Sequence, residues 1–423
     1  MRVLLVGSGG REHALAWGLA RSSRLSELHA APGNPGIAAI ATCHPVAADD
    51  PESLTALAVS LAADLVVIGP EVPLVAGLAD RLAVTGIATF GPMQAAARLE
   101  GSKAFAKNVM AAAGVATATF SLCDTLAAAQ LAIAEADGDV VVKADGLAAG
   151  KGVFVCNSVS EAEQAVRACL IDRRFGGAGG RVLIEQRMHG AEVSMLALCS
   201  GSDVLPLAPA RDYKRAQDGD HGPNTGGMGC ISPVPGMDDV QVDEIVDAVH
   251  RPVIAELARR GVEFRGCLYA GLMLTDDGPR VLEFNTRWGD PETQVLVPRL
   301  NGDLLDALLR VATGDLAGAS LSISDEACVT VVLAAAGYPD APERGAVISG
   351  VERTAGHPGV TVFHAGTELD GERLRVAGGR VLNVSATGAD LGEARRRAYR
   401  AAAEIEFEGM QVRSDIGEVS TLV

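Results

Sequence analysis

The stretch Lys143-Ala-Asp-Gly-Leu-Ala-Ala-Gly-Lys-Gly152 constrains the fold of this chain more than any other. It lies between two apolar β-branched runs, Val140–Val142 and Val153–Val155, so the order predicts strand, glycine-rich turn and strand. Such a turn exposes backbone N–H groups, and its two lysines add positive charge, which suits phosphate binding. It is not a Walker A loop, because Asp145 stands where that pattern needs its first glycine. Taken alone, the pattern fits a phosphate-binding lid and a plain surface hairpin equally well.

Composition excludes several classes of protein. A length of 423 residues predicts two to four domains, and 48% hydrophobic residues are typical of a globular protein. A net charge of −17 without a basic cluster argues against nucleic-acid binding. The eight cysteines form no C-x-x-C pair, which favours free thiols in a reducing compartment. The longest apolar run, Leu54–Ile68, is interrupted by Ser60 and Asp64 and is too short to span a bilayer, so a cytoplasmic location is expected.

Residues 1–100 alternate short apolar strands with helices, which predicts a parallel sheet covered on both faces. Three glycine turns, Gly7–Gly10, Gly33–Gly36 and Gly69–Glu71, follow the strands, where ligands of such sheets collect. The first turn is not a dinucleotide fingerprint, because Glu12 occupies the place of the third glycine. The turn Gly33–Gly36 fits either a phosphate grip or an ordinary β-turn.

The segment Leu99–Lys107 predicts the start of a helix capped by Ser102. Lys103 then lies in the first turn, where a cation opposes the helix dipole unless an anion offsets it. The position therefore indicates either a nearby phosphate or a simple exposed lysine.

A polar region and a β-hairpin complete the chemistry-bearing part of the chain. The stretch 211–229 is too long for an ordinary connection and combines cations with glycines, a composition that suits anion recognition. After an amphipathic helix over 238–260, a predicted hairpin ends in Glu283-Phe-Asn285. Period-two alternation places Glu283 and Asn285 on one face, and their oxygens suit Mg²⁺. From about residue 320 a β-rich α+β lobe follows, with no evident catalytic cluster.

Six motifs occur together in one order along the chain. They are Gly7-Ser-Gly-Gly-Arg-Glu-His13, Gly33-Asn-Pro-Gly36, Leu99–Lys107, Lys143–Gly152, His221–Gly229 and Glu283–Glu292. In this combination the chain resembles, over essentially its whole length, the glycinamide ribonucleotide synthetases (phosphoribosylamine–glycine ligases) of the ATP-grasp superfamily. The resemblance implies a multidomain α/β and α+β fold. It has an N-terminal parallel-sheet, substrate-binding domain (1–102), an ATP-grasp domain (103–320) with a mobile lid subdomain (118–190), and a C-terminal β-rich α+β domain (321–423).

The resemblance also implies a reaction, the ATP-dependent ligation of glycine to 5-phosphoribosylamine through a glycyl phosphate, in purine biosynthesis. This chemistry agrees with the residues, because phosphoryl transfer needs positioning and charge neutralisation rather than a protein nucleophile. The expected cofactors are ATP and Mg²⁺, with Mn²⁺ as an alternative. The expected partners are the two small substrates, with no nucleic acid or membrane, and the chain is expected to be a monomer.

The family pattern assigns roles to individual positions. Lys103 and Lys143 would contact ATP phosphates under the closing loop that contains Gly146, Gly150 and Gly152, and Glu185 and Glu192 would flank adenine and ribose. Glu283 and Asn285 would hold the metal, and Arg287, Lys143, Asp212 and Lys214 would be the catalytic set. Gly33, Asn34, Pro35 and Gly36 would bind the ribose phosphate, and Asn224, Thr225, Gly226, Gly227, Met228 and Gly229 would shape the acceptor pocket.

Three departures from the family pattern are visible. Tyr213 stands where the family usually has His, Trp288 replaces the usual Phe, and the ending Ser414–Ser420 is only partly kept. Two other functions remain open: another ATP-grasp carboxylate–amine ligase with a different acceptor, and a catalytically silent nucleotide-binding or scaffold protein. Product analysis would decide the first, and an ADP-release assay the second.

Overall fold

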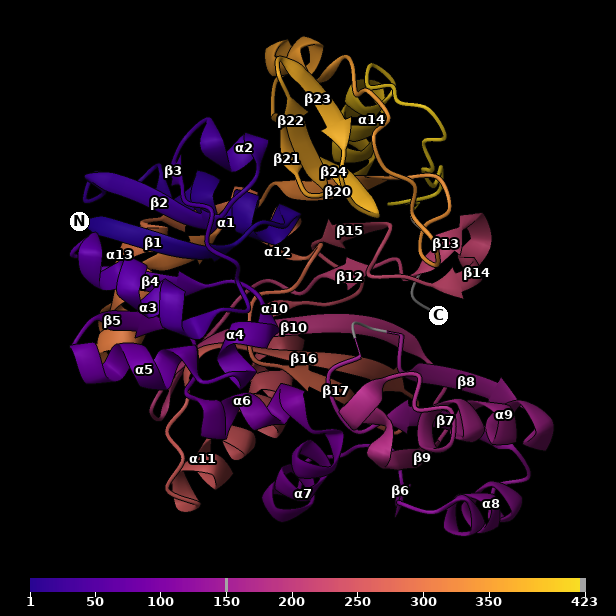
Figure 1. Cartoon of the computed structure of the whole chain (residues 1–423). Coiled ribbons are helices and arrows are strands. Elements are labelled where there is room, and N and C mark those ends of the chain that lie inside the picture. The colour runs from indigo at the N-terminus through magenta and orange to yellow at the C-terminus, as the bar shows by residue number, and fades with distance from the viewer. Residues whose placement is uncertain (149–150, 419–423) are drawn as a thin grey trace.

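The computed structural model describes residues 1–148 and 151–418. An N-terminal lobe, a C-terminal lobe and a lid subdomain surround a central antiparallel sheet (Figure 1). None of the helices in the described part of the chain is long and apolar enough to cross a membrane.

The N-terminal lobe contains the predicted parallel sheet, with strand order β3-β2-β1-β4-β5. Buried aliphatic side chains fill β1 and β4 on both faces, as expected for strands between two layers of helices. All three glycine turns begin at the carboxyl ends of these strands, where Gly33 N donates to Gly7 O (3.1 Å) and Gly69 N to Val6 O (3.0 Å). The elements are β1 (Arg2–Gly7), α1 (Gly10–Leu19), β2 (Glu27–Pro32), α2 (Pro35–Ala38), β3 (Thr42–Cys43), α3 (Pro51–Ser60), β4 (Leu65–Ile68), α4 (Glu71–Val75), α5 (Leu78–Thr85), β5 (Ala88–Phe90) and α6 (Gln94–Gly101).

The central sheet has the order β11-β10-β16-β17, and its apolar face packs on helices α7 and α11. The single helix predicted over 238–260 is continuous but changes its hydrogen-bonding pattern, with a π segment over Val246–His250. Pro252 explains the change, because it has no N–H to continue the α-helical pattern. The elements are α7 (Lys103–Ala113), β10 (Ala191–Ser200), β11 (Asp203–Pro206), α10 (Asp239–Ile245), α11 (Arg251–Arg259), β16 (Arg265–Thr275) and β17 (Gly278–Asn285).

The lid subdomain is a four-stranded antiparallel sheet of order β6-β9-β7-β8 with two helices packed against it. The strand–turn–strand prediction is confirmed, because β7 and β8 form a hairpin in which Lys143 is the register partner of Val153. The elements are β6 (Phe120–Cys123), α8 (Leu126–Glu135), β7 (Asp139–Ala144), β8 (Val153–Asn157), α9 (Val159–Leu170) and β9 (Val182–Gln186).

The C-terminal lobe is built on the sheet β12-β15-β20-β24-β21, covered by α14. Two of its strands, β12 and β15, come from the polar region 211–232, more than 90 residues before β20. The lobe therefore carries part of that region on its edge. The elements are β12 (Arg211–Asp212), β13 (Arg215–Gln217), β14 (His221–Asn224), β15 (Gly229–Ser232), β20 (Ala327–Ala334), β21 (Val360–His364), β22 (Thr367–Asp370), β23 (Arg373–Val376), β24 (Arg380–Gly388) and α14 (Leu391–Ala402).

One cluster of buried side chains joins the N-terminal lobe to the central sheet. It includes Leu5 of β1, Leu198 of β10, the fully buried Trp288 and Leu308. Burying this much apolar surface fixes the carboxyl ends of β1 and β4 against the exit of β17. The connecting elements are α12 (Thr293–Leu296), β18 (Leu300–Gly302), α13 (Leu304–Thr313) and β19 (Leu321–Ile323).

Candidate active site

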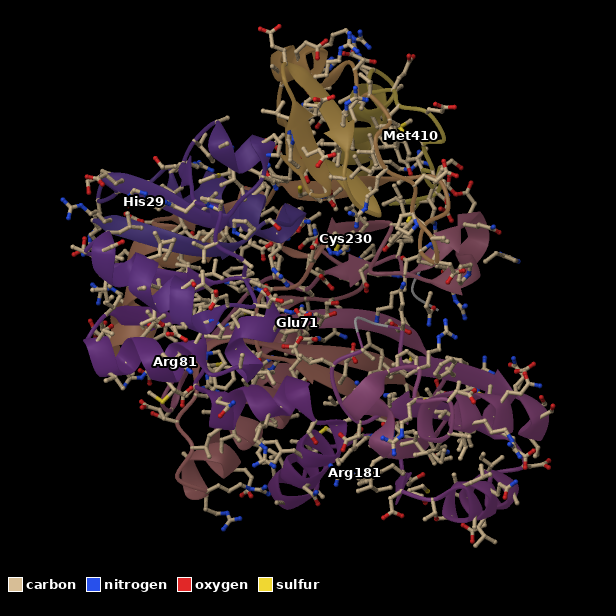
Figure 2. The ribbon with its side chains drawn as sticks, in the orientation of Figure 1. His29, Glu71, Arg81, Arg181, Cys230 and Met410 are labelled. Atoms are coloured by element: carbon tan, nitrogen blue, oxygen red, sulfur yellow. The ribbon has the colours of Figure 1, made fainter. Side chains whose placement is uncertain are left out.

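A cavity of about 370 Å³ lies where the lobes meet, and its wall is rich in charge. Figure 2 shows one of its residues, Glu71, near the middle of the molecule among many polar side chains. Its cations are Arg11, Lys103, Lys107, Lys214, Arg287 and Arg380, and its carboxylates are Glu71, Glu100, Glu185, Asp212, Glu283, Asp290 and Glu292.

Lys103 lies in the first turn of α7, as predicted, and it lines this cavity. The Ser102 hydroxyl accepts from Phe105 N (3.2 Å), which confirms the predicted cap. Asp145, at the start of the glycine loop, accepts from Ser102 Oγ (3.0 Å) and Ala104 N (3.1 Å). The helix start therefore anchors the loop. The loop glycines Gly146 and Gly152 line the cavity, while Gly150 lies outside the described residues.

Lys143 lies directly behind the wall, bound to two residues that form it. Its Nζ is 2.9 Å from Glu185 Oε2 and donates to Leu282 O (3.0 Å). Glu185 Oε2 also pairs with Lys107 Nζ (3.3 Å), whereas the buried Glu185 Oε1 has no hydrogen-bond partner among the described residues. The pKa of Lys107 is lowered to about 8, mainly by burial; Glu185 opposes the fall, and neighbouring Lys143 adds to it. Sequence reasoning missed Lys107, although it lies one helical turn after Lys103 on the same face.

The predicted residues Glu192, Asp212 and Lys214 lie together. Lys214 Nζ pairs with Glu192 Oε2 at 2.6 Å, and Glu192 stands outside the cavity wall that Asp212 and Lys214 help to form. Burial raises the pKa of Asp212 to about 7, with Glu292 and Glu192 adding to the rise and Lys214 opposing it. A carboxyl group in this state can exchange a proton near neutral pH.

Glu283 and Asn285 lie two residues apart on β17 and both line the cavity. A register shift opposite Gly271 and Leu272 precedes them, and such irregularities re-aim side chains. Burial would raise the pKa of Glu283, but the surrounding cations, led by Lys103, bring it below its usual value. The carboxylate is therefore ionised, and no donor within residues 1–148 and 151–418 reaches it.

These two residues fit a divalent cation that also binds phosphate. The described residues contain no cluster of three metal-binding His, Cys, Asp or Glu side chains. Glu283 supplies a free carboxylate, and Asn285 Oδ1 accepts from Arg287 Nη2 at 3.2 Å, which leaves one lone pair available. Mg²⁺ is commonly held by one or two protein oxygens together with substrate phosphates and water.

Arg287 is held between two carboxylates of the N-terminal lobe that sequence reasoning missed. Its Nε lies 3.3 Å from Glu71 Oε2, and its Nη2 lies 3.0 Å from Glu100 Oε1. The other Glu100 oxygen accepts from Thr286 N (2.8 Å), so Glu100 fixes both the backbone and the side chain at the exit of β17. The only available signals were that Glu71 ends a predicted turn and Glu100 belongs to the motif at 99–107.

The predicted acceptor residues separate into two groups. Thr225 and Gly226 line the cavity, Asn224 ends β14 on the surface, Gly227 has φ +109°, and Met228 and Gly229 are buried. Gly33, Asn34, Pro35 and Gly36 are not part of the cavity wall as the described residues define it. Asn34 Oδ1 caps α2, and its Nδ2 donates to Ser8 O and His364 O (both 2.8 Å). Phosphate binding by this turn stays a prediction.

The turn at Gly36 meets the C-terminal lobe at a histidine pair. His13 Nδ1 accepts from His364 N at 2.8 Å, and a Cβ on Gly36 would lie 2.2 Å from the His13 ring. Burial, assisted by His364, lowers the pKa of His13 to about 3. Both lobes are therefore joined through a neutral imidazole.

Acidification is expected to destabilise this junction. Between pH 6.5 and 3 the unfolded chain binds a proton at His13 that the folded chain excludes, so stability falls as pH falls through this range. The loss due to His13 between pH 7.5 and pH 5 is about 2 kcal/mol. His13→Asn keeps an acceptor for His364 N but does not titrate, so urea unfolding of this variant should show a fall smaller by that amount. Replacing the exposed His189 by Asn should leave the loss of stability between pH 7.5 and pH 5 as in the wild type. The same loss in His13→Asn as in the wild type would contradict the role given to His13.

Three family profiles match the chain one after another. Residues 1–100 match "Phosphoribosylglycinamide synthetase, N domain", residues 101–293 match "Phosphoribosylglycinamide synthetase, ATP-grasp (A) domain", and residues 328–419 match "Phosphoribosylglycinamide synthetase, C domain". Together the three matches cover most of the chain.

Relatives and solved structures agree with these matches. A phosphoribosylamine–glycine ligase of Mesorhizobium japonicum is 50% identical over 417 residues, covering 99% of this chain and 98% of the relative. One of Streptomyces coelicolor is 52% identical over 419 residues, covering 98% of each. The crystal structure of phosphoribosylamine–glycine ligase from Thermotoga maritima superposes with a TM-score of 0.86 at 36% identity, covering 98% of this chain and 100% of that chain. A biotin carboxylase domain from Hydrogenobacter thermophilus shares the fold, with a TM-score of 0.75 at 19% identity and coverage of 97% and 91%.

Proposed function

Since the chain belongs to the phosphoribosylglycinamide synthetase family, we propose how the side chains around its cavity divide the work of the reaction. The chain is an ATP-dependent ligase that joins glycine to 5-phosphoribosylamine, giving glycinamide ribonucleotide, ADP and phosphate in purine biosynthesis. The observation that carries the assignment of roles is the convergence of Lys103, Glu283, Asn285 and Arg287, from two segments far apart in the sequence, on one cavity.

The first half of the reaction transfers the γ-phosphoryl group of ATP to a glycine carboxylate oxygen, so a P–O bond forms as ADP leaves. Lys103 and Lys143 hold the phosphates, and Glu185 and Glu192 flank the base and the ribose. Glu283 and Asn285 hold a divalent cation, proposed to be Mg²⁺ with Mn²⁺ as an alternative, and bound there it would neutralise phosphate charge. Arg287, always charged, stabilises the transferring group or the glycine carboxylate. Its place between Glu71 and Glu100 keeps it oriented before substrate binds.

The second half is attack of the phosphoribosylamine nitrogen on the glycyl phosphate, in which the C–N bond forms and phosphate leaves. The nitrogen loses a proton in this step, and Asp212, with a pKa of about 7, is placed in the cavity wall to accept it. Lys214 and the segment Asn224–Gly229 shape the acceptor side of the pocket. The turn Gly33–Gly36 is proposed to contact the ribose phosphate from the N-terminal lobe.

We also propose the organisation of the chain as an N-terminal substrate-binding domain (1–102), an ATP-grasp domain (103–320) with a lid (118–190), and a C-terminal domain (321–423). The chain is further proposed to act as a monomer. All eight cysteines are free thiols, which supports a cytoplasmic location.

Measuring ADP release with and without each substrate tests the proposed function. Release should require glycine, and full turnover should require phosphoribosylamine, with glycinamide ribonucleotide as the identified product. Turnover with a different amine acceptor would show another ATP-grasp ligase, and no ADP release under any condition would show a silent nucleotide-binding protein. Removing divalent cations with a chelator and then adding back either Mg²⁺ or Mn²⁺ would establish which cation supports ADP release.

The glycine loop is expected to close over bound nucleotide. Asp145 fixes its beginning, and Lys103 lines the cavity beside the loop, where bound phosphate would offset its charge. Amide hydrogen exchange over Gly146–Ala148 and Lys151–Gly152 should therefore slow when ATP and Mg²⁺ are added, and not when AMP is added. Exchange in α14, far from the cavity, is the internal control. Equal exchange with and without ATP would identify a rigid platform rather than a lid.

A further inference from the structure

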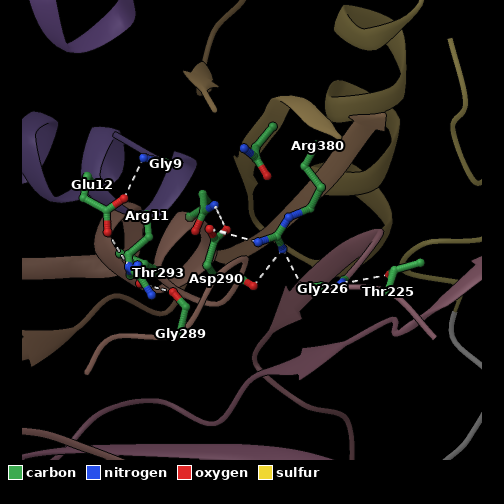
Figure 3. Close-up of polar contacts among 12 residues, drawn as sticks. Gly9, Arg11, Glu12, Thr225, Gly226, Gly289, Asp290, Thr293 and Arg380 are labelled. Carbon is green, nitrogen blue, oxygen red and sulfur yellow. Dashed lines mark hydrogen bonds and ion pairs between the residues drawn. The ribbon is translucent and has the colours of Figure 1, made fainter. Parts of the chain in front are cut away.

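The C-terminal lobe reaches the cavity although its sequence contains no evident catalytic cluster. Arg380 extends from the first position of β24 into the cavity wall, and Tyr338 follows β20. The guanidinium of Arg380 lies between the acceptor segment and the segment that follows β17 (Figure 3). The lobe therefore contacts two parts of the site at once.

Both backbone groups of Gly226 are held from this lobe. Gly226 N donates to Tyr338 Oη at 2.9 Å, and Gly226 O accepts from Arg380 Nη1. The next residue, Gly227, has φ +109°, and a Cβ there would lie 2.6 Å from Pro291 Cδ. Gly226 has no side chain, so Tyr338 and Arg380 hold it through its backbone groups alone. The neighbouring Thr225 is held separately, because its N (2.7 Å) and its Oγ1 (2.8 Å) both donate to Lys214 O.

Arg380 is in turn fixed by Asp290. Its Nη2 lies 3.0 Å from Asp290 Oδ2, and its Nη1 donates to Asp290 O at 2.8 Å. Asp290 Oδ1 accepts from Gln294 Nε2 at 2.7 Å, which anchors the carboxylate to α12. The pair is largely buried, with 19% and 16% of the two side chains exposed, so water competes little with these contacts.

We propose that Arg380 and Tyr338 are positioning residues that hold the Gly226 peptide, and with it the wall against which the amine acceptor binds. The proposal rests on the proposed function, because it takes Thr225–Gly226 as part of the acceptor pocket. In the proposed function, glycine and ATP bind on the side of Lys103, Glu283 and Arg287. The contacts of Arg380 and Tyr338 described above go to Gly226 and Asp290 instead. These two side chains, called the clamp below, should therefore govern acceptor binding and leave glycyl phosphate formation nearly unchanged.

Hydroxylamine separates the two half-reactions. It is small enough to attack glycyl phosphate without the acceptor pocket, forming a C–N bond and releasing phosphate to give glycyl hydroxamate. Arg380→Met should raise the KM for phosphoribosylamine about 10-fold or more, as expected for losing hydrogen bonds from a charged group. Tyr338→Phe removes one neutral contact and should raise it about 3-fold. ATP- and glycine-dependent hydroxamate formation should stay within about 2-fold of wild type, since neither substrate meets the clamp.

The control is Arg375→Met in the same lobe. Arg375 also pairs with a carboxylate, Asp370 (2.9 Å), and donates to a carbonyl, Gly345 O (2.7 Å), but it is not part of the cavity wall. Arg375→Met should change neither the KM for phosphoribosylamine nor the rate of hydroxamate formation. The proposal is overturned if hydroxamate formation falls in parallel with phosphoribosylamine transfer, or if the KM for phosphoribosylamine is unchanged. If Arg380→Met does not fold, the same two measurements on Tyr338→Phe, the KM for phosphoribosylamine and the rate of hydroxamate formation, decide. If the wild-type protein forms no hydroxamate, the proposed glycyl phosphate intermediate is contradicted instead. The KM for phosphoribosylamine then still tests the role of Arg380 and Tyr338.

Discussion

Glu283→Gln is expected to lower kcat about 10²- to 10³-fold while leaving the protein folded. The amide keeps the size of the side chain but loses the charge that would hold a divalent cation beside the phosphates. Glu283 accepts no hydrogen bond from the described residues, so the substitution breaks no hydrogen bond and removes only its attraction to the surrounding cations, led by Lys103. Steady-state ADP release at saturating Mg²⁺ measures the effect.

The matched control is Asp277→Asn, an exposed carboxylate in the turn between β16 and β17. It removes the same charge from the same hairpin at a distance from the cavity and should leave kcat within about 2-fold of wild type, as exposed ion pairs contribute little. Raising Mg²⁺ should partly restore Glu283→Gln if the cation is bound more weakly. Near-normal kcat at ordinary Mg²⁺ would exclude Glu283 as a metal ligand.

Local patterns in the sequence predicted the parts of the site that depend on local geometry. Ser102 was recognisable as a cap because a hydroxyl before an apolar helix satisfies the first N–H groups. Glu283 and Asn285 share a face because strands alternate, and the strand–turn–strand order of the lid follows from β-branched runs around glycines. Each of these features depends on fewer than about ten residues.

Contacts between distant segments were not predictable in this way. Glu100 and Thr286 meet across 186 residues, and Arg380 and Asp290 across 90 residues. Helical and strand periodicities relate only residues a few positions apart, so no sequence pattern links these pairs, and only the fold brings their side chains together. The same holds for β12 and β15, which pair with the C-terminal lobe although they belong to the polar region at 211–232.

Arg287→Met is expected to reduce kcat/KM at least about 10³-fold, the scale on which arginines act in phosphoryl transfer. It should also reduce stability, because Glu100 and Glu71 would lose their shared cation in a buried region. Side-chain exposure at Glu100 is only 6%, and burial already raises its pKa while Arg287 opposes the rise. Removing one partner of a buried pair costs about 3–5 kcal/mol. Urea unfolding and ADP release measure the two losses separately.

A second substitution separates the structural role of Arg287 from its proposed chemical role. Glu100→Gln in the Arg287→Met background removes the unbalanced charge, and the amide oxygen can still accept from Thr286 N. The double variant should therefore unfold at higher urea than Arg287→Met alone, while its turnover stays as low. Recovery of activity together with stability would mean that Arg287 only balances Glu100 and does not act on the substrates. Low activity in a variant of restored stability would support a direct role, in which Arg287 stabilises the charge on the transferring phosphoryl group or on the glycine carboxylate.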